Sequence, residues 1–381
     1  MMRLPSNALN IAALDAFVFR APIVAPVRTS FGEMHDRPAV FVRVTDQDGA
    51  VGWGEVWCNF PACGAEHRGR LVETVMRPLL QGQRFDDPVE VFSFLSQHTG
   101  VLAIQSGEPG PIAQAIAGID LALWDLCARR AGQPLWRYLG GGSSNVGVYA
   151  SGINPEQPQD TISACQREGY TAFKLKIGFG RDKDISNLED IRNRFGDNID
   201  LMADANQAWS VDEACDMVRR LDEFGLSWLE EPLRADRPLN EWNTLATACN
   251  IPLAAGENVI GEHAFLQMVN HAPVSVVQPD IAKWGGISGC WPVIRAIHSR
   301  GKRYCPHYLG AGVGLLASAH LLAAVGGNGL LEIDANPNPL RSALAAPMCN
   351  IVNGSIDLAD VPGIGVPVDL QRHIPMHLAS H

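Results

Sequence analysis

From residue 146 onward the chain repeats one pattern, a short apolar run followed by a longer amphipathic stretch. The eight apolar runs cover residues 146–152, 172–178, 199–205, 226–232, 251–257, 274–280, 302–307 and 329–334. The stretch VDEACDMVRRLDEFG (211–225) is typical of the helices between them. This alternation predicts an α/β domain with a parallel sheet, most simply a modified (β/α)8 TIM barrel of seven to eight βα units. An open doubly wound sheet would usually show GxGxxG after its first strand, which this sequence lacks.

The first part of the chain has a different pattern. Residues 13–20, 39–46 and 51–57 read as strands, and the polar DQDG (46–49) joins the last two as a hairpin. Residues 111–132 then read as a helix that begins with a proline and ends with a glycine. We therefore expect an N-terminal α+β capping domain over residues 1–132 and a barrel over residues 133–349. Residues from about 350 to 381 are expected to pack back on the N-terminal domain.

From the second onward, each predicted barrel strand carries an ionisable group at its last residues, after an apolar run. These groups are Lys176, Asp204, Glu230, Glu257, Asp280, His307 and Glu332, spaced by one βα unit each. The C-terminal ends of all strands in a barrel open on the same face. The pattern therefore predicts that these side chains meet in one pocket.

Three consecutive strand ends carry the acids Asp204, Glu230 and Glu257. Without a counter-ion, the repulsion among three neighbouring carboxylates would cost on the order of several kcal/mol. All-oxygen ligation suits Mg²⁺, with Mn²⁺ as an alternative. We predict that the trio binds this metal, against the alternative that each acid is a solvated loop residue.

Two lysines, Lys174 and Lys176, project from one face of the strand FKLKIG. With a metal nearby, each charge lowers the pKa of the other lysine, so that one of them can act as a base. Strand alternation places Lys176 nearer the mouth, which makes it the predicted base and Lys174 a partner for carboxylates. On the other side, Asp280 can orient His307 as a second acid or base. Glu332 is expected to donate a hydrogen bond to the substrate carboxylate if its pKa is raised.

Composition sets limits on the partners. The 381 residues carry 30 Lys and Arg against 41 Asp and Glu, a net charge of −11, which argues against nucleic acid or an anionic membrane as a partner. The nine cysteines show no CxxC pair, as expected for reduced thiols in a cytoplasmic protein. We see neither a secretory signal nor an apolar run long enough to cross a membrane.

Together the segments FKLKIG, LMADANQAW, WLEEP, GEN, QPDIAKWGGISG, CPHYLGAGVGLLASAHLLAA and LLEID resemble the enolase superfamily, in particular its mandelate racemase subgroup. The resemblance implies Mg²⁺ on the acid trio, Lys176 and the His307–Asp280 pair as the two bases, and contact of Glu332 with the substrate carboxylate. It places Lys283, Asn206 and Glu231 in support of these groups. The muconate lactonizing branch carries a catalytic lysine where this chain has Asp280, so the mandelate racemase branch is favoured.

The resemblance also implies that loops of the N-terminal domain close the barrel mouth and set specificity. The candidate loops are VAPVRTSFGEMHD (24–36) and EVWCNFPACGAEH (55–67). Within them we single out Arg28, His35, Trp57, Asn59 and Phe60. A homo-oligomer is expected for this family.

The predicted activity is Mg²⁺-dependent removal of the proton alpha to a carboxylate of a small-molecule substrate. Dehydration of an acid sugar, an aldonate or aldarate, to a 2-keto-3-deoxy acid is the favoured outcome. A racemase or epimerase of a 2-hydroxy acid and a sugar-acid lactone cycloisomerase remain open, since both share the first step. A metal-dependent amidohydrolase would usually carry HxH after the first strand, which is missing here, and a non-catalytic binding homologue would be expected to have lost a ligand or a base.

Overall fold

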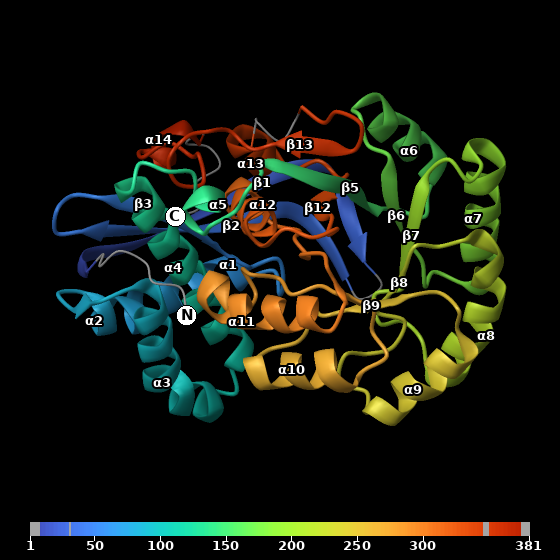
Figure 1. The fold of residues 1–381 in the computed structure, drawn as a ribbon, viewed down its shortest axis with the longest axis horizontal. Coiled ribbons are helices and arrows are strands. Elements are labelled where there is room, and N and C mark those ends of the chain that lie inside the picture. The colour runs from blue at the N-terminus through green and yellow to red at the C-terminus, as the bar shows by residue number, and fades with distance from the viewer. Residues whose placement is uncertain (1–7, 30–31, 346–349, 375–381) are drawn as a thin grey trace.

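The computed structural model describes residues 8–29, 32–345 and 350–374. Two packed units are visible in Figure 1, an N-terminal antiparallel sheet with helices and a curled parallel sheet surrounded by helices. The predicted α+β unit and the predicted (β/α) barrel fold are both confirmed.

The N-terminal sheet has the strand order β3-β2-β1-β4. Its elements are β1 (Leu9–Thr29), β2 (Gly32–Asp46), β3 (Val51–Val56), α1 (Gly64–Leu71), the π-helical η1 (Val72–Met76), α2 (Arg77–Leu80), β4 (Arg84–Phe85), α3 (Pro88–Ser106), α4 (Pro109–Arg130) and α5 (Leu135–Tyr138). The predicted hairpin between residues 46 and 49 joins β2 to β3, whose pairing begins at Thr45 and Val51.

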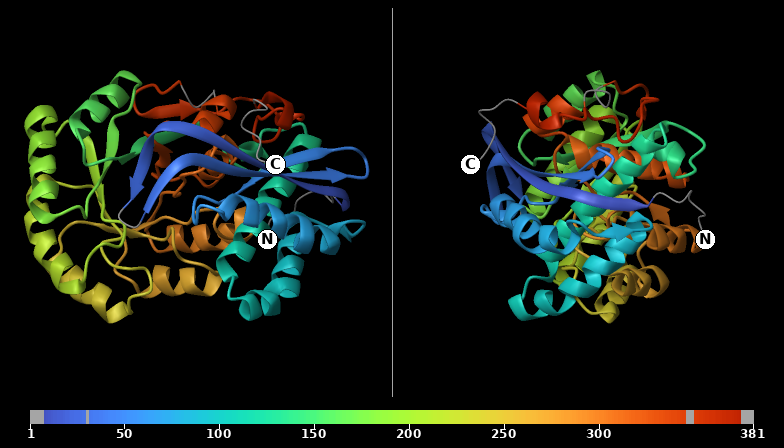
Figure 2. Two further views of the ribbon diagram at one scale, coloured as in Figure 1. Left: turned by 180° about the vertical axis from the view of Figure 1, so that it is seen from behind. Right: turned by 90° about the vertical axis from the view of Figure 1, so that its left-hand side faces the viewer.

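Strands β1 and β2 are much longer than β3 and carry the N-terminal domain over to the barrel, as the two blue strands of Figure 2 show. The segment 24–36, expected to be a loop, is mostly part of this ladder, because Val27 pairs with Met34 and Thr29 with Gly32. Both Val27 and Met34 are buried.

The barrel sheet contains eight parallel strands in the order β11-β10-β9-β8-β7-β6-β5-β12. Its elements are β5 (Asn145–Ile153), α6 (Pro158–Arg167), β6 (Ala172–Lys176), α7 (Arg181–Phe195), β7 (Asp200–Asp204), α8 (Val211–Leu221), the 3₁₀ turn η2 (Asp222–Phe224), β8 (Leu229–Glu230), α9 (Leu239–Ala248), β9 (Leu253–Ala255), α10 (Glu262–His271), β10 (Val276–Val277), α11 (Gly286–Ser299), β11 (Arg303–Tyr304), α12 (Gly312–Val325), β12 (Leu331–Asp334), α13 (Pro339–Leu344), β13 (Ser355–Asp357) and α14 (Leu370–His373).

One apolar layer fills the barrel interior, and the polar layer of the site lies directly above it. The apolar layer takes one residue from each of seven successive strands or their ends: Tyr149, Ala172, Met202, Trp228, Ala254, Val276 and Cys305. Side chains two residues further along a strand point to the same face. The next layer toward the strand ends therefore includes Ser151, Lys174, Asp204, Glu230, Gln278 and His307, all of them buried.

The C-terminal segment packs against both units. Strand β13 pairs with β5 of the barrel. Further on, Asp125 of α4 accepts a hydrogen bond from Ile364 N at 2.7 Å, and Trp53 Nε1 donates to Val368 O at 3.0 Å.

Helix α4 is the one helix of the described part that is long and apolar enough to cross a membrane. Most of its apolar residues are buried, and the helix packs on β3 and α3. Two glycines of β3 allow this close approach, because a Cβ on Gly52 or Gly54 would lie 2.0 Å from a backbone oxygen of α4. We therefore assign α4 to the core of the N-terminal unit.

Candidate active site

The predicted ring of ionisable residues is assembled at the C-terminal ends of the barrel strands. Lys176 lies beside Asp204 in the pairing of β6 with β7, and Asp204 lies beside Glu230 in the pairing of β7 with β8. Lys174 and Lys176 are both buried, at 2% and 3% exposure. Lysine is almost never this buried without partners, so the site must supply compensating charge.

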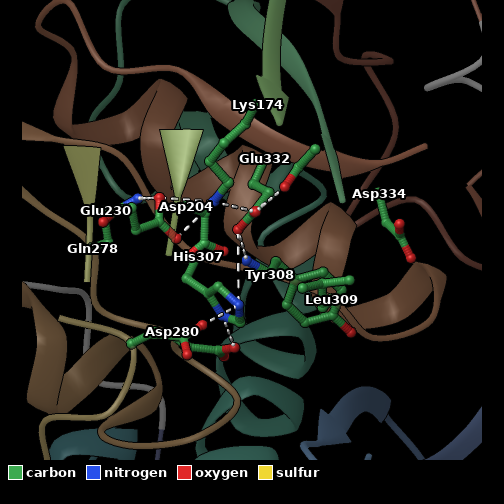
Figure 3. Close-up of polar contacts among 12 residues, drawn as sticks. Lys174, Asp204, Glu230, Gln278, Asp280, His307, Tyr308, Leu309, Glu332 and Asp334 are labelled. Atoms are coloured by element: carbon green, nitrogen blue, oxygen red, sulfur yellow. Dashed lines mark hydrogen bonds and ion pairs between the residues drawn. The ribbon is translucent and has the colours of Figure 1, made fainter. Parts of the chain in front are cut away.

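Lys174 is held between two carboxylates. Its Nζ lies 2.6 and 2.7 Å from the two carboxylate oxygens of Glu230 and 2.8 Å from Oε1 of Glu332 (Figure 3). Burial would lower the pKa of Lys174, but the charges of Glu230 and Glu332 raise it well above its usual value. The role of Lys174 as a carboxylate partner fits this geometry, and the residue remains an ammonium group.

The Glu230 carboxylate has further donors. Its Oε2 accepts from Gln278 Nε2 at 2.6 Å and from Trp228 Nε1 at 3.2 Å. These bonds fix the carboxylate at the centre of the barrel.

His307 lies between carboxylates on the opposite side. Its Nδ1 is 2.7 Å from Oδ2 of Asp280, and because a carboxylate can only accept, Nδ1 is the donor. Its Nε2 is 2.5 Å from Oε2 of Glu257 and 3.9 Å from Oε2 of Glu332. Burial would lower the pKa of His307, but the neighbouring Glu257 and Glu332 charges and the bond to Asp280 raise it well above its usual value.

Glu332 lies among hydrogen-bond donors and cationic groups. It accepts a hydrogen bond from Ser151 Oγ. It also accepts from Tyr308 N at 2.9 Å and contacts Lys174 (Figure 3). Burial would raise its pKa, but Lys174 and His307 keep it below the usual value. The raised pKa on which hydrogen-bond donation by Glu332 depends is therefore not found here, since two cationic groups stabilise the ionised form.

The acid trio differs in the partners of its members. Asp204 accepts from N and Nδ2 of Asn206, both at 2.8 Å, whereas Glu257 accepts from Asn258 Nδ2 at 2.7 Å. Burial and the Glu230 charge raise the pKa of Asp204 to about 7. Burial would raise the pKa of Glu257 as well, but His307 and Lys283 hold it well below the usual value.

Within the described ranges no three His, Cys, Asp or Glu side chains are already gathered closely enough to hold a metal. Glu230 is drawn to Lys174 and Glu257 to His307. The donor set nevertheless fits a hard divalent cation, because the buried carboxylates of Asp204 and Glu230 and the half-buried carboxylate of Glu257 lie on neighbouring strand ends with no thiolate among them. Ligation would require Glu257 to exchange its contact with His307 for the cation.

Glu231 and Lys283 support this edge through Asn258. Asn258 Nδ2 donates to both oxygens of Glu231, at 3.1 and 2.9 Å, and Lys283 Nζ donates to Asn258 Oδ1 at 2.9 Å. Lys283 Nζ is also 3.8 Å from Glu257 and lies over the Trp57 ring. Burial and the Glu257 charge raise the pKa of Glu231 well above its usual value.

A cavity of about 250 Å³ opens between these groups and the N-terminal domain. It is lined by Val27, Met34, Trp57, Asn59, Phe60, Lys176, Asn206, Gln207, Glu257, Asn258, Lys283, His307 and Leu309. Lys174, Asp204, Glu230, Asp280 and Glu332 lie deeper and do not line it. The cavity therefore brings Lys176, Lys283 and the imidazole of His307 to the same space.

The specificity candidates divide into two groups. Trp57, Asn59 and Phe60 line the cavity. His35 lies apart from them, because its side chain is 76% exposed beside Glu33 and is not part of the described cavity lining. The side chain of Arg28 lies outside the described part of the structure.

Several residues of the site were not singled out from the sequence. Ser151 and Gln278 follow two residues after Tyr149 and Val276 of the apolar layer, so the same period of two that places Lys174 above Ala172 could have found them. Leu309 and Met34 had no such signal, because they reach the cavity from the segment after β11 and from the β1–β2 ladder.

The fold and the site together define a member of the enolase superfamily. Residues 13–140 match the family described as mandelate racemase / muconate lactonizing enzyme, N-terminal domain, and residues 159–372 match the family described as enolase C-terminal domain-like. The chain belongs to the mandelate racemase/muconate lactonizing enzyme family.

Solved structures agree with this assignment. A mandelate racemase/muconate lactonizing enzyme from Bordetella bronchiseptica RB50 is 55% identical, with 96% of this chain and 100% of that chain covered and a TM-score of 0.91. A racemase from Streptomyces coelicolor A3(2) with bound magnesium is 28% identical, with 97% and 100% covered and a TM-score of 0.86.

Among curated proteins, the D-galactarolactone cycloisomerase of Agrobacterium fabrum is 29% identical over 95% of this chain and 97% of its own length. The relatives as a group include acid-sugar dehydratases, cycloisomerases, racemases and epimerases. These activities are lyase or isomerase reactions, and the family is one of enzymes.

Proposed function

We propose that this protein removes the proton alpha to the carboxylate of a small acid sugar and then dehydrates it to a 2-keto-3-deoxy acid. The observation that carries the proposal is the convergence of Lys176 and His307 on one cavity, with Asp280 fixing the imidazole. Two proton-transfer groups with one oriented partner are what a stepwise elimination needs. Members of the family bind Mg²⁺, and we assign it here to Asp204, Glu230 and Glu257.

Bound Mg²⁺ would supply positive charge beside the substrate carboxylate and so stabilise the enediolate that forms when the alpha proton leaves. Lys176 takes this proton at Nζ. His307 then gives the proton on Nε2 to the β-hydroxyl as the carbon–oxygen bond breaks, and water leaves. The resulting enol takes up a proton at carbon 3 to give the keto acid.

In this scheme Asp280 and Lys174 act through their neighbours. Asp280 accepts from Nδ1 and so directs Nε2 of His307 toward the cavity. Lys174 forms ion pairs with Glu230 and Glu332 deep in the barrel. The deep polar layer thereby fixes the groups above it.

Racemisation or epimerisation is the second candidate, favoured by the same pair. If His307 returns a proton to the alpha carbon instead of protonating a leaving group, the configuration inverts. A lactone cycloisomerase would use the same first step, and cycloisomerases are among the relatives.

The side chains of the cavity wall help to distinguish an aldonate from an aldarate as the substrate. The N-terminal domain contributes Val27, Met34, Trp57, Asn59 and Phe60 to the described lining, which are apolar or neutral side chains. A second carboxylate on the distal end of an aldarate would face these side chains, among which the described residues of that domain offer no cation, and it would lose part of its hydration. We therefore favour an aldonate, a monocarboxylate, as the substrate.

The cell compartment and the assembly also belong to this proposal. The eight cysteines whose state is described are free thiols, which supports a reducing compartment such as the cytoplasm. We expect a homo-oligomer on the basis of the family.

The test is incubation with Mg²⁺ in D₂O against aldonates, aldarates, their lactones and aromatic and aliphatic 2-hydroxy acids. Proton NMR detects exchange at the alpha carbon, and semicarbazide detects 2-keto acids. A keto acid from an aldonate supports the proposal. Alpha deuteration without a keto acid would replace dehydration by racemase or epimerase chemistry, and no reaction with any acid would overturn the proposal.

A further inference from the structure

We propose that two buried carboxylates of the N-terminal domain, Glu55 and Asp120, act as positioning residues. They hold the backbone segments next to His307 and Asp280 in place, so that the two side chains stay in hydrogen-bond contact. The inference rests on the proposed function, because it assigns a role to these residues in that reaction. Each carboxylate binds the start of the barrel helix that follows one member of the His307–Asp280 pair.

Glu55 reaches the segment after His307. It lies on β3, where Gly52 and Gly54 face α4, so strand alternation turns Glu55 to the opposite face. Its Oε1 accepts from Ala311 N at 2.6 Å and its Oε2 from Gly314 N at 2.8 Å. These amides belong to the first turn of α12, where backbone donors have no partner within the helix.

The segment between His307 and α12 has little freedom beyond this cap. Tyr308 N donates to Glu332, and Leu309 O accepts from Asn59 Nδ2 at 2.9 Å. A Cβ on Gly310 would lie 2.3 Å from Tyr308 Oη and 2.7 Å from Glu55 Oε1, so the loop is closely packed against the carboxylate. A shift of Glu55 must therefore move the backbone next to His307.

Asp120 binds the start of the helix that follows Asp280, as Glu55 does for the helix that follows His307. It projects from α4, and its Oδ2 accepts from Ile287 N at 2.7 Å and Ser288 N at 3.0 Å, in the first turn of α11. Only five residues separate Asp280 from Gly286, and Trp57 N donates to Ala282 O in this turn at 3.3 Å. Both members of the pair are thus tied to the N-terminal domain through the next helix.

Asp125 provides a matched control. It is as buried as Asp120 and lies on the same helix, but it accepts from Trp53 N at 2.8 Å and Ile364 N at 2.7 Å, away from both loops. Replacing it removes an equally buried carboxylate with no direct contact to the segments after β10 and β11. If the carboxylates only stabilised the fold, replacing Glu55 or Asp120 would affect the segments after β11 and β10 no more than replacing Asp125 does.

The first experiment needs no substrate. Amide hydrogen exchange, read by mass spectrometry on full-length protein, is compared among wild type, Glu55→Gln, Asp120→Asn and Asp125→Asn. We expect faster exchange at 305–316 in Glu55→Gln and at 280–290 in Asp120→Asn, and no change at either segment in Asp125→Asn. Unchanged protection at 305–316 in folded Glu55→Gln would overturn the proposal. Glu55→Asp, which keeps the charge, replaces it if the glutamine variant does not fold.

The second experiment uses Mg²⁺ and a pool of D-arabinonate, D-gluconate and D-galactonate in D₂O. Glu55→Gln and Asp120→Asn are expected to lose turnover on the order of 10²-fold, as a displacement of about 1 Å can cause. KM and the alpha exchange that depends on Lys176 should change little. If a variant loses deuterium exchange at the alpha carbon to the same extent as turnover, the result contradicts the proposal that Glu55 and Asp120 position the His307–Asp280 pair. If the wild type turns over none of the three acids, the proposed aldonate function fails. The amide hydrogen exchange of the first experiment still decides the positioning role, because it needs no substrate.

Discussion

The imidazole of His307 lies between two carboxylates, with Nδ1 2.7 Å from Asp280 and Nε2 2.5 Å from Glu257. Asp280 is on the strand end next to His307, and Glu257 is on the strand end beyond it. One of these acids orients the ring, and the other is a proposed metal ligand. The relationship links acid–base chemistry and metal binding in a single side chain.

The first prediction concerns proton transfer by this imidazole. We expect His307→Asn to lose dehydration by about 10²- to 10⁴-fold, the usual contribution of a positioned acid or base. Alpha deuteration by Lys176 should persist, because Lys176 reaches the cavity from another strand. NMR in D₂O measures both rates on one sample. Loss of both steps to the same extent would assign the first proton transfer to His307 instead.

The two lysines of β6 should separate stability from catalysis. Lys174→Met leaves the buried Glu230 and Glu332 carboxylates without their ammonium partner, which we expect to cost about 3–5 kcal/mol of unfolding free energy. Lys176 lies on the same face of β6 but nearer the mouth of the barrel. Lys176→Met should instead abolish deuterium exchange at the alpha carbon, with a smaller loss of unfolding free energy than Lys174→Met. Urea unfolding and deuterium exchange on both variants measure the difference. The assignment fails if Lys176→Met retains exchange.

Metal binding gives the third prediction. Mg²⁺ should raise the unfolding temperature of the wild type, because a ligand that binds the folded state alone stabilises it. Glu257→Gln should remove most of this shift. Glu262→Gln, five residues further along at the exposed start of α10, is the matched control and should keep it. Thermal unfolding across a Mg²⁺ titration provides the measurement, and an equal response of both variants would reject Glu257 as a ligand.

The convergence of the ionisable side chains at the strand ends could be predicted from the sequence, because the two-residue alternation of a strand alone decides it. A barrel strand alternates its side chains, so apolar runs ending in Lys176, Asp204 or Glu230 could only present these groups on one face. The charge state of Glu332 was not predictable in this way. It depends on Lys174 and His307, which come from two other strands.

The cavity wall was predicted less well, for a related reason. Trp57 ends a predicted strand and Phe60 follows it closely, whereas the direction of Met34 and His35 depends on the register of the β1–β2 ladder. A one-residue change of register exchanges the two faces of a strand. Met34 therefore lines the cavity while its neighbour His35 is exposed.

The last prediction concerns stability at acid pH and depends on His320 in α12. This imidazole is 2% exposed, and its Nδ1 accepts from Trp136 N at 3.1 Å. Burial lowers its pKa to about 3. An unfolded histidine has a pKa near 6.5, so between about pH 6.5 and pH 3 the unfolded chain binds a proton that the folded protein does not.

The contribution of His320 is therefore fully present above about pH 6.5 and is lost as the pH falls toward 3, by up to about 1.4 kcal/mol for each pH unit. His320→Gln should flatten this acid limb, because the glutamine oxygen can still accept from Trp136 N and carries no proton to gain. Buried Asp120, whose pKa burial raises to about 7, acts with the opposite sign over the upper part of the range. Only the difference between variant and wild type isolates His320, measured by urea unfolding from pH 7 to pH 4.5. Parallel curves for the two proteins would show that His320 does not set the acid limb.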